Sequence, residues 1–265
     1  MKSAIQNLLL ITAGAARRHG LITSGPGRWL YDHSYELYKL LLEAPGINRL
    51  QTLVRPNEWI FDVGANVGFF ARRFATWVDG EGRVIAIEPE PANMARLKLA
   101  LGRAGVLEKV DLVEAAAVGQ DGEVRLTLNP SNPADHRIGA TGISVQGVTL
   151  DGLSAARGSP RVGLIKMDIQ GAEWSALQGA QNLLTRDQPA LFIELADEAL
   201  APWGVTGADV THNLIQLGYR PHLVNRRGIS TPRTEADIAR LLDKTWYVDV
   251  LFLTPERAAA VSQHA

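Results

Sequence analysis

The 265-residue sequence contains no cysteine. This absence excludes disulfides, thiolate metal sites and cysteine nucleophiles, and it suits a reducing compartment, so we expect a cytoplasmic protein. An excess of charge of one sign is also missing, because the net charge is -1. No basic surface therefore indicates a nucleic acid as partner. No apolar run approaches the roughly 20 residues that a membrane-spanning helix needs.

The amino-terminal stretch, residues 1–18, has a loose apolar face with basic residues at its ends. This pattern predicts a short helix that packs on the rest of the protein. Peripheral contact with a membrane surface is the alternative, whereas the apolar centre is too short for a signal peptide. A second helix is expected over residues 29–42, and Pro45 and Gly46 are expected to end it.

Residues 59–70 are the most informative segment. An apolar strand leads into the small-residue turn Asp62-Val63-Gly64-Ala65-Asn66-Val67-Gly68, and a helix follows. About twenty residues later a second strand ends on Glu88, as in doubly wound α/β domains that bind a nucleoside. Glycines let the backbone approach a ligand, and the terminal acid can accept hydrogen bonds from a ribose diol.

The spacing of the turn discriminates between nucleosides. A dinucleotide motif needs glycines where this chain has Asn66 and Phe69, and no Walker A loop is present. S-adenosylmethionine fits better, because Asp62 can lie near its ammonium group and N–H groups at the helix start can meet its carboxylate. A structural turn without a ligand is the alternative interpretation.

Predicted helices and strands continue to alternate until residue 119. The third strand and its exit, residues 110–119, contain small residues that leave room for an adenine ring or, alternatively, serve tight packing. Alternation within residues 123–128 and 143–150 then predicts extra strands, separated by a polar stretch that contains His136. Such an insertion often forms a substrate wall, and a lone loop histidine is usually only solvated.

Two further apolar strands end on acids, namely Asp168 after residues 162–167 and Glu194 after residues 190–193. Carboxyl ends of parallel strands share one sheet edge, so Asp62, Glu88, Asp168 and Glu194 are expected to meet there. Strand alternation places Lys166 on the same face as Asp168, where it orients an acid or closes a salt bridge.

The carboxyl-terminal third continues the pattern. It predicts a single helix after Glu173, another helix over residues 209–217, and strands over residues 219–224 and 245–253. Glu173 is expected to act at the start of its helix rather than in the chemistry. The alanine-rich tail from residue 254 onward is expected to fray.

These motifs together resemble the FkbM family of S-adenosylmethionine-dependent methyltransferases over residues 53–195. The matching segments are Asp62 to Gly68, Glu88-Pro89, Ala117-Val118-Gly119, Thr149-Leu150-Asp151 and Lys166 to Glu173. The resemblance implies an α/β fold, a Rossmann-like class I methyltransferase sheet of about seven strands. We expect a helical extension over residues 1–52, a methyltransferase domain over residues 53–265, and a β insertion after the third core strand.

The resemblance also implies O-methylation of a hydroxyl on a sugar or another secondary metabolite, that is, a small-molecule or glycan acceptor. The predicted cofactor contacts are Asp62, Gly64, Ala65, Asn66, Gly68, Glu88, Pro89, Ala116, Ala117 and Asp168. Asp168, Glu194 and Lys166 are the catalytic candidates, because a hydroxyl acceptor must lose a proton to a base.

One residue departs from the family pattern, since Gln170 stands where a glutamate is usual. If that acid is a base or metal ligand in the family, this chain lacks it. We predict no metal because no Asp/His cluster has telling spacing, with Mg²⁺ held by paired carboxylates as the alternative. A non-catalytic S-adenosylmethionine-binding or assembly protein and, less favoured, an NAD-dependent oxidoreductase are the competing hypotheses.

Overall fold

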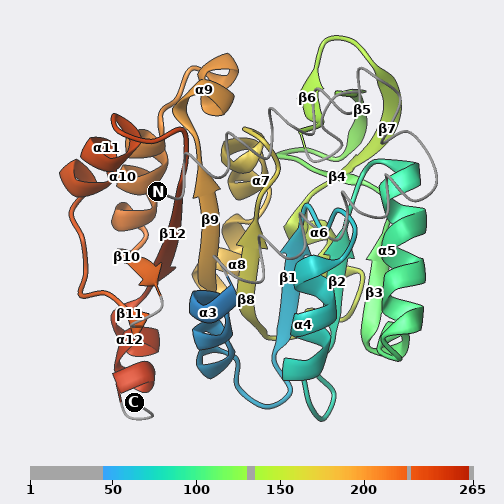
Figure 1. Ribbon diagram of the computed structural model, residues 1–265, viewed down its shortest axis with the longest axis horizontal. Helices are drawn as coiled ribbons and strands as arrows, with labels where there is room; N and C mark the ends of the chain where they lie inside the picture. Colours follow the sequence, from blue (N-terminus) through green and yellow to red (C-terminus); the bar gives the residue numbers. More distant parts are fainter. Residues whose placement is uncertain (1–43, 130–134, 226–227, 263–265) are drawn as a thin grey trace.

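The computed structural model describes residues 44–129, 135–225 and 228–262. These residues form an eight-stranded sheet, in the order β11-β10-β12-β9-β8-β1-β2-β3, with helices on both faces (Figure 1). Its strands are β1 Trp59–Val63, β2 Val84–Ile87, β3 Val110–Val113, β8 Val162–Met167, β9 Ala190–Leu195, β10 Arg220–Asn225, β11 Gly228–Ile229 and β12 Val248–Leu253. The expected Rossmann-like sheet is confirmed, with the two-residue β11 as an added edge.

The order of the strands creates the site. β1, β2, β3, β8 and β9 are mutually parallel, and β12 runs antiparallel between β9 and β10. The chain proceeds from β1 outward to β2 and β3, and later returns to β8 on the other side of β1. Ligands of open α/β sheets bind at the carboxyl ends of strands beside such a switch point.

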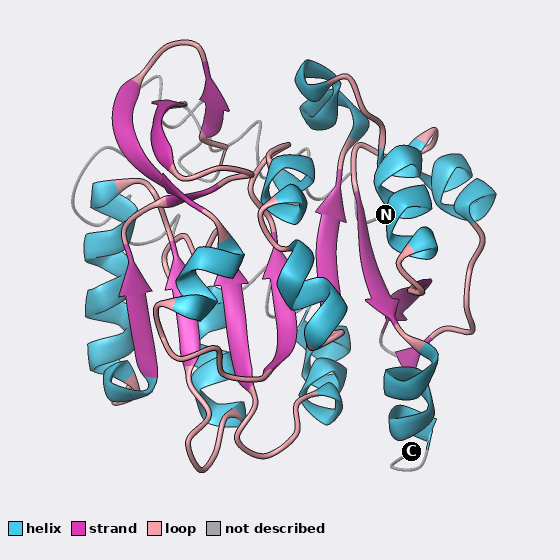
Figure 2. Ribbon diagram, turned by 180° about the vertical axis from the view of Figure 1, so that it is seen from behind, coloured by secondary structure: helices cyan, strands magenta, loops and turns pink. Residues whose placement is uncertain are grey.

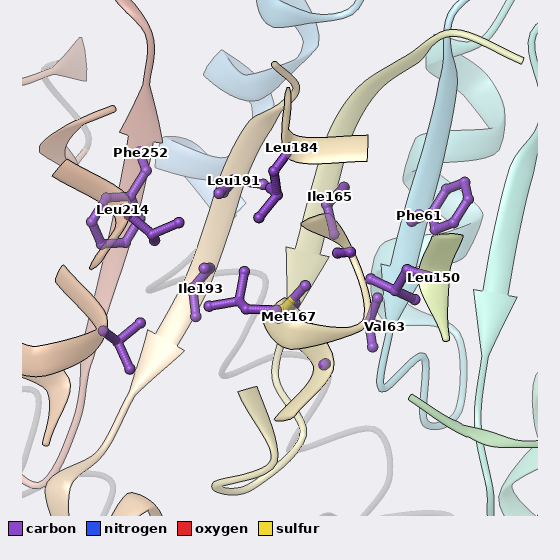
Figure 3. Close-up of a cluster of buried hydrophobic side chains, with 14 of the residues drawn as sticks. Phe61, Val63, Leu150, Ile165, Met167, Leu184, Leu191, Ile193, Leu214 and Phe252 are labelled. Atoms are coloured by element: carbon purple, nitrogen blue, oxygen red, sulfur yellow. The ribbon is translucent and has the colours of Figure 1, made fainter. Parts of the chain in front are cut away.

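Both faces of the sheet are covered by helices (Figures 1 and 2). The helices are α3 Ala44–Ile47, α4 Phe69–Trp77, α5 Pro91–Arg103, α6 Leu150–Ala155, α7 Glu173–Gln178, α8 Gln181–Arg186, α9 Asp197–Leu200, α10 Gly207–Gln216, α11 Glu235–Leu242 and α12 Pro255–Ser262, with 3-10 turns η1 Asn48–Leu53, η2 Leu107–Lys109 and η3 Ala201–Trp203. Because successive side chains of a strand point to opposite faces, two separate cores form. Phe61, Ile165 and Met167 pack with α6, α7, α8 and α10 on one face (Figure 3), and Ile60 and Leu164 pack with α4 and α5 on the other.

The expected β insertion is present as a second sheet in the order β4-β7-β5-β6. Its strands are β4 Ala116–Ala117, β5 Gly122–Thr127, β6 Arg137–Gly139 and β7 Ile143–Val148. Two details differ from expectation. Part of the stretch expected as a polar loop forms β6, a three-residue edge strand that needs no apolar alternation. The segment that follows the third core strand, β3, leaves the main sheet and forms β4, which pairs with β7 in the second sheet.

The single helix expected after Glu173 is wrong, because two helices, α7 and α8, are present. The break lies at Gly179, where a Cβ would collide with the carbonyl oxygen of Val118. Asp151 caps the new helix, since its carboxylate accepts hydrogen bonds from the backbone N–H groups of Asn182 and Leu183 at 2.9 Å each. A close backbone approach thus interrupts a helical pattern of apolar residues.

The expectation for the tail is also wrong, since residues 255–262 form α12. Arg257 in this helix is buried. Its Nη2 lies 3.1 Å from Oε1 of the buried Glu58, its Nη1 donates to the Leu53 carbonyl at 3.0 Å, and its Nε donates to the Gln188 carbonyl at 2.9 Å. One guanidinium therefore fixes α12 to the start of β1 and to the segment before β9.

Near the other end, Pro45 and Gly46 lie inside α3. The helices predicted for residues 1–18 and 29–42 lie outside the described residues, so the boundary at residue 52 stays a prediction. None of the helices in the described ranges is long and apolar enough to cross a membrane.

Candidate functional site

The turn between β1 and α4 is shaped by its backbone. Gly64, Asn66 and Gly68 have φ values of 76°, 49° and 93°, in the left-handed region that glycine and asparagine tolerate best. The N–H groups of Gly64 and Ala65 both donate to the carbonyl of Ile87, at 3.0 and 2.9 Å. The turn is thereby fixed against the end of β2, which explains why the motif requires these residue types.

Gly64 also lies against the segment after β8. A Cβ at this position would collide with the Asp168 carbonyl oxygen and would lie 2.9 Å from a methyl group of Ile169. The missing side chain therefore lets two predicted site segments, the cofactor turn and the Asp168 segment, meet.

We expect Gly64→Ala to lower the free energy of unfolding by about 3 kcal/mol or more, because it combines a left-handed backbone with a backbone collision. Gly105→Ala is the matched control, since Gly105 has a φ of 67° and open space around its Cβ position. That control is expected to lose about 1 to 2 kcal/mol. Urea denaturation measures both values, and equal losses would contradict the close-approach argument.

Asp62 and Lys166 form a buried ion pair beneath the turn. Asp62 is 0% and Lys166 2% exposed, and Nζ of Lys166 lies 3.2 Å from Oδ1 of Asp62. The same ammonium group donates to the carbonyls of Gly64 at 2.7 Å and Val63 at 3.2 Å. Of the two roles expected for Lys166, the salt bridge is observed, and it involves Asp62.

Glu88 follows β2 and faces the turn. Its Oε2 accepts a hydrogen bond from the Asn66 N–H at 2.9 Å, and its Oε1 accepts one from the Glu90 N–H at 3.0 Å. Burial raises the pKa of this carboxyl to about 7, against the lowering effect of those hydrogen bonds. Oε1 also accepts a hydrogen bond from the side-chain amide of Asn93 at 3.5 Å, so Oε2 is the oxygen that keeps a further lone pair for a ribose hydroxyl.

These features fit the nucleoside part of S-adenosylmethionine. Gly68 is buried against α5, where a Cβ would lie 2.7 Å from the side chain of Leu97, whereas Gly64 and Asn66 of the turn are partly exposed beside Glu88. Pro89, half-buried, continues from Glu88 toward α5. The segment after β3 starts beside the same acid, because the Glu88 N–H donates to the Val113 carbonyl at 3.1 Å.

Ala116 and Ala117 lie further along this segment, both buried in β4. Ala117 packs in the core that contains Leu150. The tight packing foreseen for these small residues is therefore observed, and their contact with an adenine ring stays a prediction. His136, in the insertion, accepts a hydrogen bond from the Asn129 N–H through Nδ1 at 3.0 Å.

The structure brings Asp168 and Glu194 together at the carboxyl ends of β8 and β9. Gln170 joins them, because its Nε2 donates to Oδ1 of Asp168 at 2.9 Å and to Oε1 of Glu194 at 3.2 Å. In the sequence, Gln170 stands out only as a missing acid. The sequence feature that could have indicated this contact is a side-chain amide located between two strand ends that each carry a carboxylate.

Glu173 organises the loop that carries Asp168 and Gln170. Its carboxylate, almost fully buried, accepts hydrogen bonds from the N–H groups of Ile169 and Gly171 at 2.9 Å each. Burial raises the pKa of this carboxyl to about 7. Glu173 lies in the first turn of α7, as expected, and its carboxylate bonds the loop before that helix. Within the described part of the chain, no group of three or more His, Cys, Asp or Glu side chains is arranged to hold a metal ion.

Comparison with known proteins agrees with this geometry. Residues 62–221, more than half of the chain, match the family described as Methyltransferase FkbM domain. The 2-O-methyltransferase NoeI of Sinorhizobium fredii (strain NBRC 101917 / NGR234) is 29% identical over 171 residues, which cover 56% of this chain and 67% of that protein.

A solved structure of this family shows a similar fold. The methyltransferase FkbM from Methylobacillus flagellatus KT superposes with a TM-score of 0.50 at 20% identity, covering 82% of this chain and 50% of that chain. The chain thus spans half the length of that relative. A SAM dependent methyltransferase from Aquifex aeolicus gives a TM-score of 0.45 at 13% identity, covering 81% of this chain and 90% of that one. With a family match over most of the sheet and a turn that suits the cofactor, the chain belongs to the FkbM family of S-adenosylmethionine-dependent methyltransferases.

Proposed function

We propose that the protein transfers a methyl group from S-adenosylmethionine to a hydroxyl oxygen of a sugar or another polyhydroxylated secondary metabolite. The observation that carries this proposal is the pair of carboxylates, Asp168 and Glu194, held by one amide beside the cofactor turn. Oxygen as the acceptor atom is supported by the relative named a 2-O-methyltransferase.

Three parts of the chain bind or support the cofactor in this proposal. Glu88 accepts a ribose hydroxyl through Oε2, the backbone from Gly64 to Gly68 lies beside the rest of the molecule, and Lys166 with Asp62 keeps the carbonyls of that turn in place. Bound S-adenosylmethionine supplies an electrophilic methyl group on a sulfonium. Much of the rate of such a transfer can come from holding the acceptor oxygen in line with that methyl group.

On the acceptor side, Asp168 is the base. It follows β8, which is the immediate neighbour of β1, and its main chain contacts the cofactor turn at Gly64. Asp168 takes the proton of the acceptor hydroxyl while the oxygen of that hydroxyl forms its bond to the methyl carbon and the bond between that carbon and sulfur breaks, so that S-adenosylhomocysteine would be the leaving group. Glu194 lies on the next strand, about 4.8 Å further out, and binds a neighbouring hydroxyl of the acceptor.

The test is methyl transfer to a panel of monosaccharides, oligosaccharides and polyols, with calorimetric titration of the cofactor. Glu88→Ala is expected to weaken S-adenosylmethionine binding by about 100-fold, because hydrogen bonds to a charged acceptor are lost. Binding to the wild-type protein is expected to weaken as the pH falls below about 7, where Glu88 takes up a proton.

The outcomes separate the competing functions. Cofactor binding without transfer to any hydroxylated acceptor would favour a non-catalytic binding or assembly protein. Binding of NAD in place of S-adenosylmethionine would favour an oxidoreductase.

A further inference from the structure

Gln170 uses one amide nitrogen for two carboxylates. The amide carries two N–H groups, and one is available for each of Asp168 and Glu194. The opposite orientation of the amide would place its carbonyl oxygen against two anions, so the chemistry fixes which atom faces them. The distance between Oδ1 of Asp168 and Oε1 of Glu194 therefore cannot exceed the sum of these two hydrogen-bond lengths.

The backbone of Gln170 is held in a disfavoured conformation. Its φ is 53°, in the left-handed region that residues with a Cβ rarely adopt. The surrounding loop enforces this conformation, since Glu173 accepts the N–H groups on both sides of Gln170 and the Asp168 N–H donates to the Val63 carbonyl at 3.2 Å. Strain of this kind persists where the neighbouring structure over-determines it, often at functional sites.

The Gln170 amide lies among several negatively charged side chains. Two carboxylates this close favour protonation of each other. Further acids lie nearby, because Glu173 interacts with Asp168 and Asp249 of β12 is paired with Glu194. Lys166, a cation of β8 two residues before Asp168, is in contact with Asp62 and the turn carbonyls.

We propose that Gln170 is a positioning residue that keeps the carboxylates of Asp168 and Glu194 ionised and oriented for proton removal from the acceptor. This inference rests on the proposed function. A glutamine is suited to the role because its amide donates to both anions and adds no charge, whereas a glutamate at the same position would add a third negative charge.

Two variants test the role, Gln170→Glu and Gln170→Met. Both remove the donors while keeping a side chain of similar length. In the pH dependence of kcat, we expect the loss of activity on the acid side to move to higher pH by about one unit or more. The reason is that an added negative charge or a lost hydrogen bond favours protonation of the two carboxylates. At neutral pH kcat is expected to fall by about tenfold or more and to recover at higher pH. Unchanged S-adenosylhomocysteine binding shows that each variant is folded.

A second measurement does not depend on turnover. Hydrogen bonds to the ionised pair stabilise the folded protein at high pH, and this contribution is lost as the pH falls and the pair takes up protons. The difference in unfolding free energy between wild type and Gln170→Met should therefore grow as the pH rises through the range in which the pair loses its protons. A difference that is constant with pH would assign Gln170 to packing alone and overturn the inference.

The two proposals fail in different ways. Overlapping kcat profiles of wild type and both variants would overturn the role of Gln170 and leave O-methylation standing. Absence of methyl transfer by the wild-type protein, together with a constant stability difference, would overturn both.

Discussion

Asp168→Asn is expected to lower kcat for methyl transfer by about 100- to 10,000-fold, the range that a positioned general base contributes. Asparagine has nearly the same shape and keeps the backbone contact between residue 168 and Gly64. Its amide cannot accept the proton of the acceptor hydroxyl. The loss should appear in kcat, and because Asp168 is also a predicted cofactor contact, S-adenosylmethionine affinity measured by calorimetry separates a loss of the base from a loss of cofactor binding.

Glu194→Gln is the matched comparison, since Glu194 shares the Gln170 amide but lies one strand further from the cofactor turn. We expect this variant to raise the KM for the acceptor more than it lowers kcat, as expected when binding rather than proton transfer is removed. If Asp168→Asn kept its kcat while Glu194→Gln lost it, the roles of the two carboxylates would be exchanged.

Arg257→Met is expected to reduce the free energy of unfolding by about 3 to 5 kcal/mol, because it leaves the charge of Glu58 buried without its main partner. Arg257 and Glu58 are 4% and 3% exposed, and two guanidinium nitrogens reach the two carboxylate oxygens at 3.1 Å each. The carbonyls of Leu53 and Gln188 would lose their donor as well. Guanidinium-induced unfolding, followed by circular dichroism, measures the loss.

A control variant is available in the same helix, α12. Glu256 is next to Arg257 and forms an exposed ion pair with Arg55 at 3.4 Å, with 70% of its side chain exposed. Glu256→Gln should change stability by less than about 0.5 kcal/mol, as is usual for exposed pairs. Similar losses for the two variants would indicate that the buried pair contributes no more than a surface one.

The central sheet was predictable because its strands are short apolar runs buried on both faces. In β8, for example, all six residues are buried. Parallel direction then placed Asp62, Glu88, Asp168 and Glu194 at one edge without any knowledge of their contacts. The turn was predictable because Gly64, Asn66 and Gly68 are the residue types that a left-handed backbone selects.

Features that depend on distant partners were not predictable. Nothing near Arg257 in sequence indicates Glu58, which lies 199 residues away. The break at Gly179 depends on a carbonyl from another segment, that of Val118. Gln170 looked like the loss of an acid, because its role requires a positive φ together with carboxylates delivered by two different strands.

The contact between Arg257 and Glu58 has a consequence for the order of folding during synthesis. Domains generally fold as units while the ribosome extends the chain by about 5 to 20 residues per second. Glu58 emerges early, at the entrance to the first strand, but its buried partner Arg257 emerges only after the whole sheet has been made. Until residue 257 leaves the ribosome, a nascent chain must either keep Glu58 in water or bury it with the largely exposed Arg161, at 3.3 Å, as its ion-pair partner. The start of β1 is therefore expected to become protected from hydrogen exchange last, although it is among the first parts of the sheet to be translated.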